Sequence, residues 1–286
     1  MKRVSIVMLA AFLAVVLGPL GAASAKNETA KSTDGLSLSF SVQGTGEPAI
    51  VFVHGWCCDR SYWKDQIPYF EKKHAVVALD LAGHGGSGLG REDWTIQSFA
   101  ADVVSVVDAL KLTKVLLVGH SMGGPVSLEA ARMMPGRVIG VIGVDTFQDF
   151  GETYTEEQQK QWLAAFEADF PTTTDRFVRS MFPAGADSAL VARVASDMAS
   201  SPAAVGIGAM RNMLRYDPAP AAGEIEVPIR GINADKWPTN VEGNRKYATS
   251  FDVKLMPGRG HFVQIEDPAT FNKLLEETIA GLAKKK

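Results

Sequence analysis

The stretch VLLVGHSMGG, residues 115–124, joins an apolar run to a glycine-rich turn, and a helical pattern follows the turn. The run is typical of a strand that is buried on both faces. Ser121 stands in a Gly-x-Ser-x-Gly pattern, which carries a nucleophilic serine on a strained strand-to-helix turn. Gly119 and Gly123 let strand and helix approach closely because they have no Cβ. We therefore predict that Ser121 is a catalytic nucleophile; the alternative is an incidental serine in a glycine-rich turn.

Other strands and helices alternate on both sides of this stretch. Residues 36–42 alternate apolar and polar side chains, whereas residues 49–53, 75–81 and 138–145 form nearly continuous apolar runs. Thr95 can cap a helix whose apolar residues recur at steps of three and four. Strands that alternate with helices predict an α/β fold, with a mostly parallel sheet covered by helices on both faces.

The alternation is interrupted by residues 147–216. This segment is rich in alanine, methionine and acidic residues, has no strand-like run and predicts several helices. Strand-like runs and a last helix then resume. We therefore predict a core made of residues 26–146 and 217–286, split by a helical cap at residues 147–216.

Residues 1–25 have the anatomy of an export signal. Two basic residues precede an apolar run, and Ala23-Ser24-Ala25 fits the small-x-small cleavage rule. The run is shorter than the ~20 residues that a membrane-spanning helix needs. We predict cleavage after Ala25 and a periplasmic or secreted protein without a stable membrane span; the alternative is an uncleaved anchor.

Charge and the remaining motifs argue against several other classes of protein. The chain has 29 basic and 32 acidic side chains, and a mildly acidic chain without a basic stripe argues against nucleic-acid binding. Residues 83–88 match G-x-G-x-x-G, but no helix opens directly after them, so we predict no nucleotide cofactor. Cys57 and Cys58 are adjacent and lack metal-site spacing, so we predict no metal. They are either buried thiols or a vicinal disulfide.

The order of HGW (54–56), DLAGHGGSG (80–88), GHSMGG (119–124) and GRGHF (258–262) resembles the α/β-hydrolase superfamily. The resemblance covers nearly the whole chain after residue 25. It implies the α/β-hydrolase fold with a helical cap, a serine hydrolase mechanism, and catalytic residues in the chain order Ser, Asp, His.

The general base and its orienting acid follow from this order. His261 lies on a loop after the last predicted strand, at the carboxyl end of the sheet, so we predict that it is the base; the alternative is a surface histidine. Asp235, after the penultimate strand, is the preferred acid. Asp145, after the strand before that, is the alternative, because the spacing from Gly231 to Asp235 is one residue longer than is usual in the family.

The resemblance also implies an oxyanion hole formed by the backbone N–H groups of Trp56 and Met122. Phe147, Trp237 and Phe262 flank the predicted catalytic residues. They either line a substrate pocket or pack in the core, since both use the same side chains.

These interpretations predict an exported serine hydrolase without a cofactor. Its substrate is a small molecule, namely a small or medium carboxylic ester, lactone or thioester, cleaved through an acyl-enzyme. One alternative uses the same triad for C–C bond hydrolysis, amide or N-terminal peptide cleavage, or cofactor-free perhydrolysis. A second alternative is a non-catalytic binding protein on the same fold.

Overall fold

The computed structural model describes residues 26–283, and these form an eight-stranded sheet in the order β1-β2-β4-β3-β5-β6-β7-β8. Strands β1 and β2 are antiparallel to their neighbours, and the others are parallel. The predicted α/β-hydrolase fold is confirmed. The predicted export signal at residues 1–25 lies outside the described residues. The strands are β1 (Lys26–Lys31), β2 (Ser37–Gln43), β3 (Ala49–Val53), β4 (Val76–Leu79), β5 (Val115–His120), β6 (Val138–Val144), β7 (Ile229–Ala234) and β8 (Asp252–Met256).

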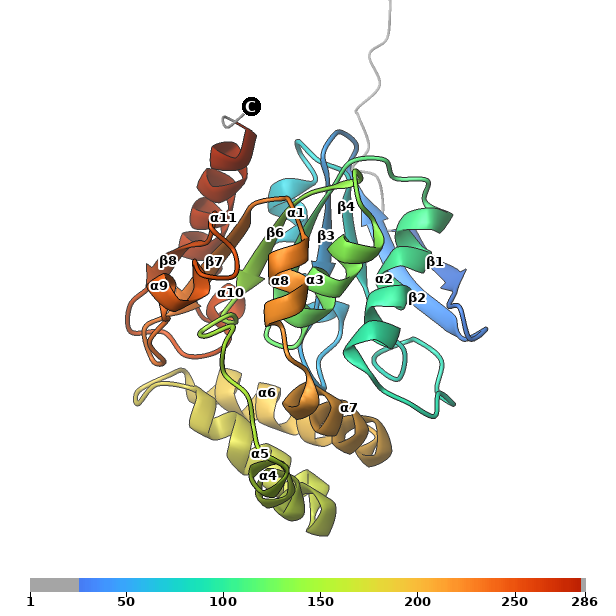
Figure 1. Ribbon diagram of the computed structural model, residues 1–286. Helices are drawn as coiled ribbons and strands as arrows, with labels where there is room; N and C mark the ends of the chain where they lie inside the picture. The colour runs from blue at the N-terminus through green and yellow to red at the C-terminus, as the bar shows by residue number, and fades with distance from the viewer. Residues whose placement is uncertain (1–25, 284–286) are drawn as a thin grey trace, which may run out of the picture.

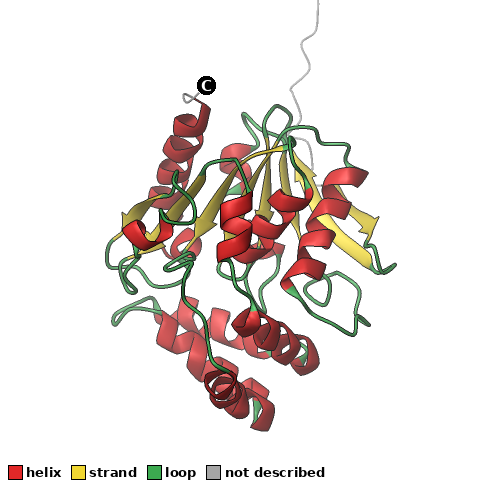
Figure 2. Cartoon of the chain, in the orientation of Figure 1, coloured by secondary structure: helices red, strands yellow, loops and turns green. Residues whose placement is uncertain are grey.

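Helices cover both faces of the sheet (Figures 1 and 2). Successive side chains of a strand point to opposite faces, so in β3 Ile50 and Phe52 pack in one apolar cluster, and Val51 and Val53 in another. The helices outside the cap are η1 (Arg60–Trp63), α1 (Ile67–Phe70), α2 (Ile96–Ala109), α3 (Gly123–Met133), α8 (Ala219–Glu224), α9 (Val241–Asn244), α10 (Val263–Glu266) and α11 (Pro268–Ala283). No helix of the described chain is both long and apolar enough to cross a membrane.

Four helices between β6 and β7 form a layer beyond one end of the sheet (Figure 1). They are α4 (Glu156–Ala168), α5 (Phe170–Met181), α6 (Ser188–Ala199) and α7 (Ala203–Arg215), and all lie within the segment predicted as the cap. Three of these helices begin at an N-capping residue. The side chains of Thr155, Asp169 and Asp187 each accept a hydrogen bond from a backbone N–H of the first turn.

Candidate active site

A cavity of about 950 Å³ lies between the carboxyl ends of the central strands and the cap. Its wall contains Ser121 and His261. The other predicted site residues in the wall are Trp56, Met122, Asp145, Phe147, Trp237 and Phe262. Asp235 is not part of the wall. The structure therefore brings most of the predicted site residues to one cavity, and Asp235 is the exception.

Ser121 occupies the strained turn that its motif predicts. Its φ is 52°, in the left-handed region, and its backbone N–H donates to the Val144 carbonyl over 3.0 Å. A Cβ added to Gly119 would lie 2.0 Å from the Gly123 carbonyl oxygen, and one added to Gly123 would lie 2.4 Å from that of Val53. Glycine is therefore required at both positions for β5 and α3 to meet at this angle.

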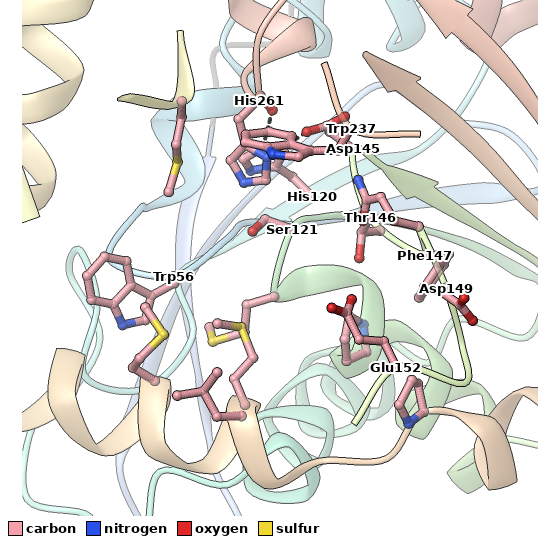
Figure 3. Close-up of a pocket in the computed structure, with 18 of the residues that line it drawn as sticks. Trp56, His120, Ser121, Asp145, Thr146, Phe147, Asp149, Glu152, Trp237 and His261 are labelled. Carbon is pink, nitrogen blue, oxygen red and sulfur yellow. Dashed lines mark hydrogen bonds and ion pairs between the residues drawn. The ribbon is translucent and has the colours of Figure 1, made fainter. Parts of the chain in front are cut away.

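His261 lies opposite Ser121 on the loop between β8 and α10 (Figure 3). Its Nδ1 donates to Asp145 Oδ2 over 2.6 Å, which leaves Nε2 as the proton acceptor on the ring. Glu266 shapes the loop, because its carboxylate accepts hydrogen bonds from the backbone N–H groups of Gly260 and Phe262. The imidazole is therefore held in the tautomer that a general base for a serine requires.

Asp145 leaves β6 with a φ of 44° and is 2% exposed. Its second carboxylate oxygen, Oδ1, accepts a hydrogen bond of 2.8 Å from the backbone N–H of Ala234, the last residue of the neighbouring strand β7. Both oxygens are thus occupied, one by His261 and one by the adjacent strand. This geometry holds the carboxylate against the ring.

The structure does not bring Asp235, the preferred acid, to His261. Asp235 follows the end of β7, its side chain is exposed, and its Oδ1 accepts the backbone N–H of Gly258 over 2.9 Å. Strand β7 continues to Ala234, the position at which the family spacing places the acid, so Asp235 stands one residue further along and emerges beyond the site. The alternative in the sequence, Asp145, is the residue that contacts His261.

The Ser121 hydroxyl forms no hydrogen bond with His261 within residues 26–283, although both side chains line the same cavity. Catalytic hydrogen bonds are often long in a free enzyme and shorten when substrate binds. The arrangement is compatible with the predicted roles of Ser121 as nucleophile and His261 as base.

The loop after β3 lies against the nucleophile turn. A Cβ on Gly55 would lie 3.1 Å from Ser121 Cβ, so the backbone at Trp56 runs beside the serine. Cys57 and Cys58 follow it as free, buried thiols, and burial raises the pKa of both. The oxyanion role of Trp56 stays a prediction, and of the two alternatives for the cysteines the structure has the buried thiols.

A model of the alpha/beta hydrolase family matches residues 50–274. The chain belongs to the alpha/beta hydrolase family. The resemblance predicted from the four motifs is thus confirmed.

Several characterised proteins are similar to this hydrolase. The 3-oxoadipate enol-lactonase 2 of Acinetobacter baylyi is 24% identical over 247 residues, which are 84% of this chain and 92% of the relative. An esterase from Thermogutta terrifontis aligns with a TM-score of 0.78 and 21% identity, over 90% of this chain and 99% of its own. A bromoperoxidase from Bacillus anthracis gives a TM-score of 0.78 and 20% identity, over 89% and 100%. At these identities the structural matches show the fold.

Sequence reasoning missed other residues of the hydrolase cavity. His120 is 1% exposed, and its Nε2 donates to the backbone carbonyl of His261 over 2.9 Å, which supports the loop of the base. Burial lowers the pKa of His120 well below its usual value, so the ring is neutral. Asp149 and Glu152 also line the cavity, from the loop after β6. No motif marks Asp149 or Glu152, and the GHSMGG motif contains His120 without indicating its role, because these roles depend on contacts between distant segments.

Methionine is the commonest apolar residue of the wall, which contains Met122, Met181, Met198, Met210 and Met213. Four of them belong to the cap, the segment that is rich in methionine in the sequence. The flexible, polarisable thioether adapts to irregular apolar ligands. Among the described residues, no group of three or more His, Cys, Asp or Glu side chains could hold a metal.

Proposed function

We propose that this member of the alpha/beta hydrolase family cleaves a small or medium carboxylic ester or lactone through an acyl-enzyme on Ser121. The observation that carries the proposal is the 2.6 Å hydrogen bond between His261 Nδ1 and Asp145 Oδ2, in a cavity that also exposes Ser121. The names of the relatives, an enol-lactonase and an esterase, support ester and lactone chemistry.

The first half-reaction begins with attack of Ser121 Oγ on the substrate carbonyl carbon. His261 Nε2 takes the hydroxyl proton, and the Asp145 carboxylate stabilises the imidazolium that results. The backbone N–H groups of Trp56 and Met122 donate to the oxyanion. Met122 stands at the start of helix α3, whose dipole favours negative charge there.

The tetrahedral intermediate then collapses and the bond to the leaving oxygen breaks. His261 gives its proton to this oxygen, which departs as the alcohol or stays attached in a lactone. Water attacks the acyl-enzyme in the second half-reaction, and His261 again takes and returns the proton. The carboxylic acid leaves and the Ser121 hydroxyl is restored.

We further propose that the mature protein is exported after cleavage behind Ala25. This rests on the basic start, apolar run and small residues of segment 1–25.

The test is to express the whole chain in bacteria, purify it from the periplasm, and treat it with a fluorophosphonate probe and with p-nitrophenyl butyrate. We expect ester turnover, one covalent adduct on Ser121, and an intact mass that begins at Lys26. Ser121→Ala should lose the adduct and at least about 10³-fold of the turnover. A wild-type protein with neither label nor turnover would contradict the hydrolase proposal, and a mass that retains residues 1–25 would contradict cleavage.

A further inference from the structure

The cavity wall carries negatively charged side chains without basic ones to balance them. The wall contains three carboxylates, those of Asp145, Asp149 and Glu152, and neither lysine nor arginine. The Asp145 carboxylate accepts a hydrogen bond from His261. The other two carboxylates take part in no ion pair with a described residue. A ligand in this cavity therefore meets two uncompensated negative charges.

Asp149 and Glu152 occupy the short loop between β6 and α4, on the other side of Ser121 from Trp56 (Figure 3). The Asp149 carboxylate is fixed, because it accepts hydrogen bonds of 2.8 Å from the Gly151 backbone and from Asn240 Nδ2. Figure 3 shows the Glu152 carboxylate directed into the cavity. Of the two, Glu152 is therefore the charge that a ligand approaches.

Aromatic rings also line the cavity, and one of them lies next to Glu152. Tyr154 lines the cavity two residues after Glu152, and the pKa of its hydroxyl is raised by burial and by the charge of Glu152. The wall also contains Trp162, which packs on Phe177, and Trp237, which packs on the His261 ring, and both are partly exposed. Aromatic faces attract cations and offer nothing to a carboxylate.

Lys236 is next to the wall residue Trp237 along the chain, and its side chain is a cation beside the cavity. Its ammonium lies 5.5 Å from the ring centre of Trp237, and the side chain is not part of the wall. Glu152 lines the cavity but is exposed to solvent, so its charge acts on a ligand at the solvent side of the cavity and is open to screening by salt.

We propose that the cavity ranks substrates by charge: esters with a cationic group are preferred, uncharged ones are accepted, and those with a carboxylate are disfavoured. Glu152 is the residue that sets this order, with Asp149 adding to it. The inference rests on the proposed function, since it names the class of ester or lactone that Ser121 meets. The methionine-rich part of the wall then takes the apolar portion of the molecule.

The test compares esters of equal size and different charge. One series varies the alcohol of a butyrate ester: choline, its uncharged analogue 3,3-dimethylbutanol, and 4-hydroxybutanoate. A second series places a cationic, neutral or anionic group at the end of the acyl chain of a p-nitrophenyl ester. In the series whose variable group reaches Glu152, we expect the anionic ester to show a kcat/KM at least about tenfold below the neutral one at low salt.

Salt and substitution separate a charge effect from a steric one. Raising the ionic strength to 1 M shortens the screening length to about 3 Å and should shrink the ratio. Glu152→Gln, which keeps the size, should raise the anionic-to-neutral ratio about threefold or more. The exposed Glu226, outside the cavity, provides the matched control Glu226→Gln, which should leave the ratio unchanged.

Equal kcat/KM for neutral and anionic esters in both series would overturn the charge ranking and leave the hydrolase function intact. If no ester is turned over, the hydrolase proposal fails separately, and binding of the same esters to Ser121→Ala by calorimetry decides the ranking. Equal affinities of neutral and anionic esters would then overturn it.

Discussion

At the scale of the residue, strained backbone is concentrated around one cavity. Five non-glycine residues of the described chain have φ between 44° and 61°. Ser121, Asp145 and Phe147 line the cavity, and Cys57 follows Trp56. Such conformations cost about 1–3 kcal/mol each, and they persist where the surrounding structure imposes them. These backbone conformations direct the side chains of Ser121, Asp145 and Phe147 from the strand ends towards the cavity.

Buried histidines couple stability to pH at the same scale. His54 and His84 are fully buried, with ring centres 5.1 Å apart, and burial lowers the pKa of His54 to about 4 and that of His84 to about 3. The unfolded chain binds a proton at each ring near pH 6.5, whereas the folded chain does not. The free energy of unfolding therefore falls as the pH drops from about 6.5 towards 4.

We predict that His84→Gln makes this dependence shallower. The glutamine amide can still donate to the Ala82 carbonyl that His84 Nδ1 contacts, but it cannot titrate. Urea unfolding at pH 6.5, 5.5 and 5.0 gives the free energy of unfolding at each pH. The slope of this free energy against pH should be steeper in the wild type than in His84→Gln, by up to about 1.4 kcal/mol per pH unit. Because carboxylates titrate alike in both proteins, parallel slopes would show that His84 does not contribute.

At the scale of the element, the cap is hydrogen-bonded to two of the loops around the site, those of Trp56 and His261. Trp56 Nε1 donates to the Gly206 carbonyl of α7 over 2.7 Å. The backbone N–H of His261 donates to the Met181 carbonyl at the end of α5 over 3.1 Å. The cap therefore helps to position the predicted oxyanion donor and the base, in addition to closing the cavity.

We predict that Trp56→Phe lowers kcat about three- to tenfold, with little change in KM. The variant keeps an aromatic ring among those of Phe166, Phe170 and Phe177 but loses the bond to Gly206. Complete loss of an oxyanion donor costs about 10²–10³-fold, so a displaced donor should cost less.

Trp63→Phe is the matched control. Trp63 is buried on the other face of the sheet, and its indole N–H has no partner among the described residues. The same loss of volume there should leave kcat unchanged. If both variants lower kcat equally, the effect comes from general destabilisation and not from the bond to the cap.

The elements were predictable because their signals are local. Strand runs, the capping threonine Thr95 and the serine motif depend on neighbours within a few residues, and each gave a correct element. The acid was not predictable in this way. Whether Asp145 or Asp235 reaches His261 depends on where β7 ends and on the Ala234 N–H, which are set by pairing with β6. Glu152 was missed because it becomes a cavity residue only when the cap folds over the sheet.

At the scale of the whole molecule, three distant segments converge to make one site. Ser121 follows β5, Asp145 follows β6, and His261 lies on the loop after β8, with cap residues completing the cavity wall. Parallel strands bring these loops to one edge of the sheet. The central claim is that this convergence makes Ser121, His261 and Asp145 act as one catalytic unit.

The most direct test is the kcat/KM of Asp145→Asn beside that of Asp235→Asn, measured with p-nitrophenyl butyrate. Each change replaces a carboxylate with an amide of the same size. We predict that Asp145→Asn loses about 10³- to 10⁴-fold, because the amide no longer stabilises the imidazolium or fixes its tautomer. Asp235→Asn should stay within about threefold of wild type, since Asp235 only accepts a hydrogen bond from Gly258. Activity that survives in Asp145→Asn and is lost in Asp235→Asn would contradict the account.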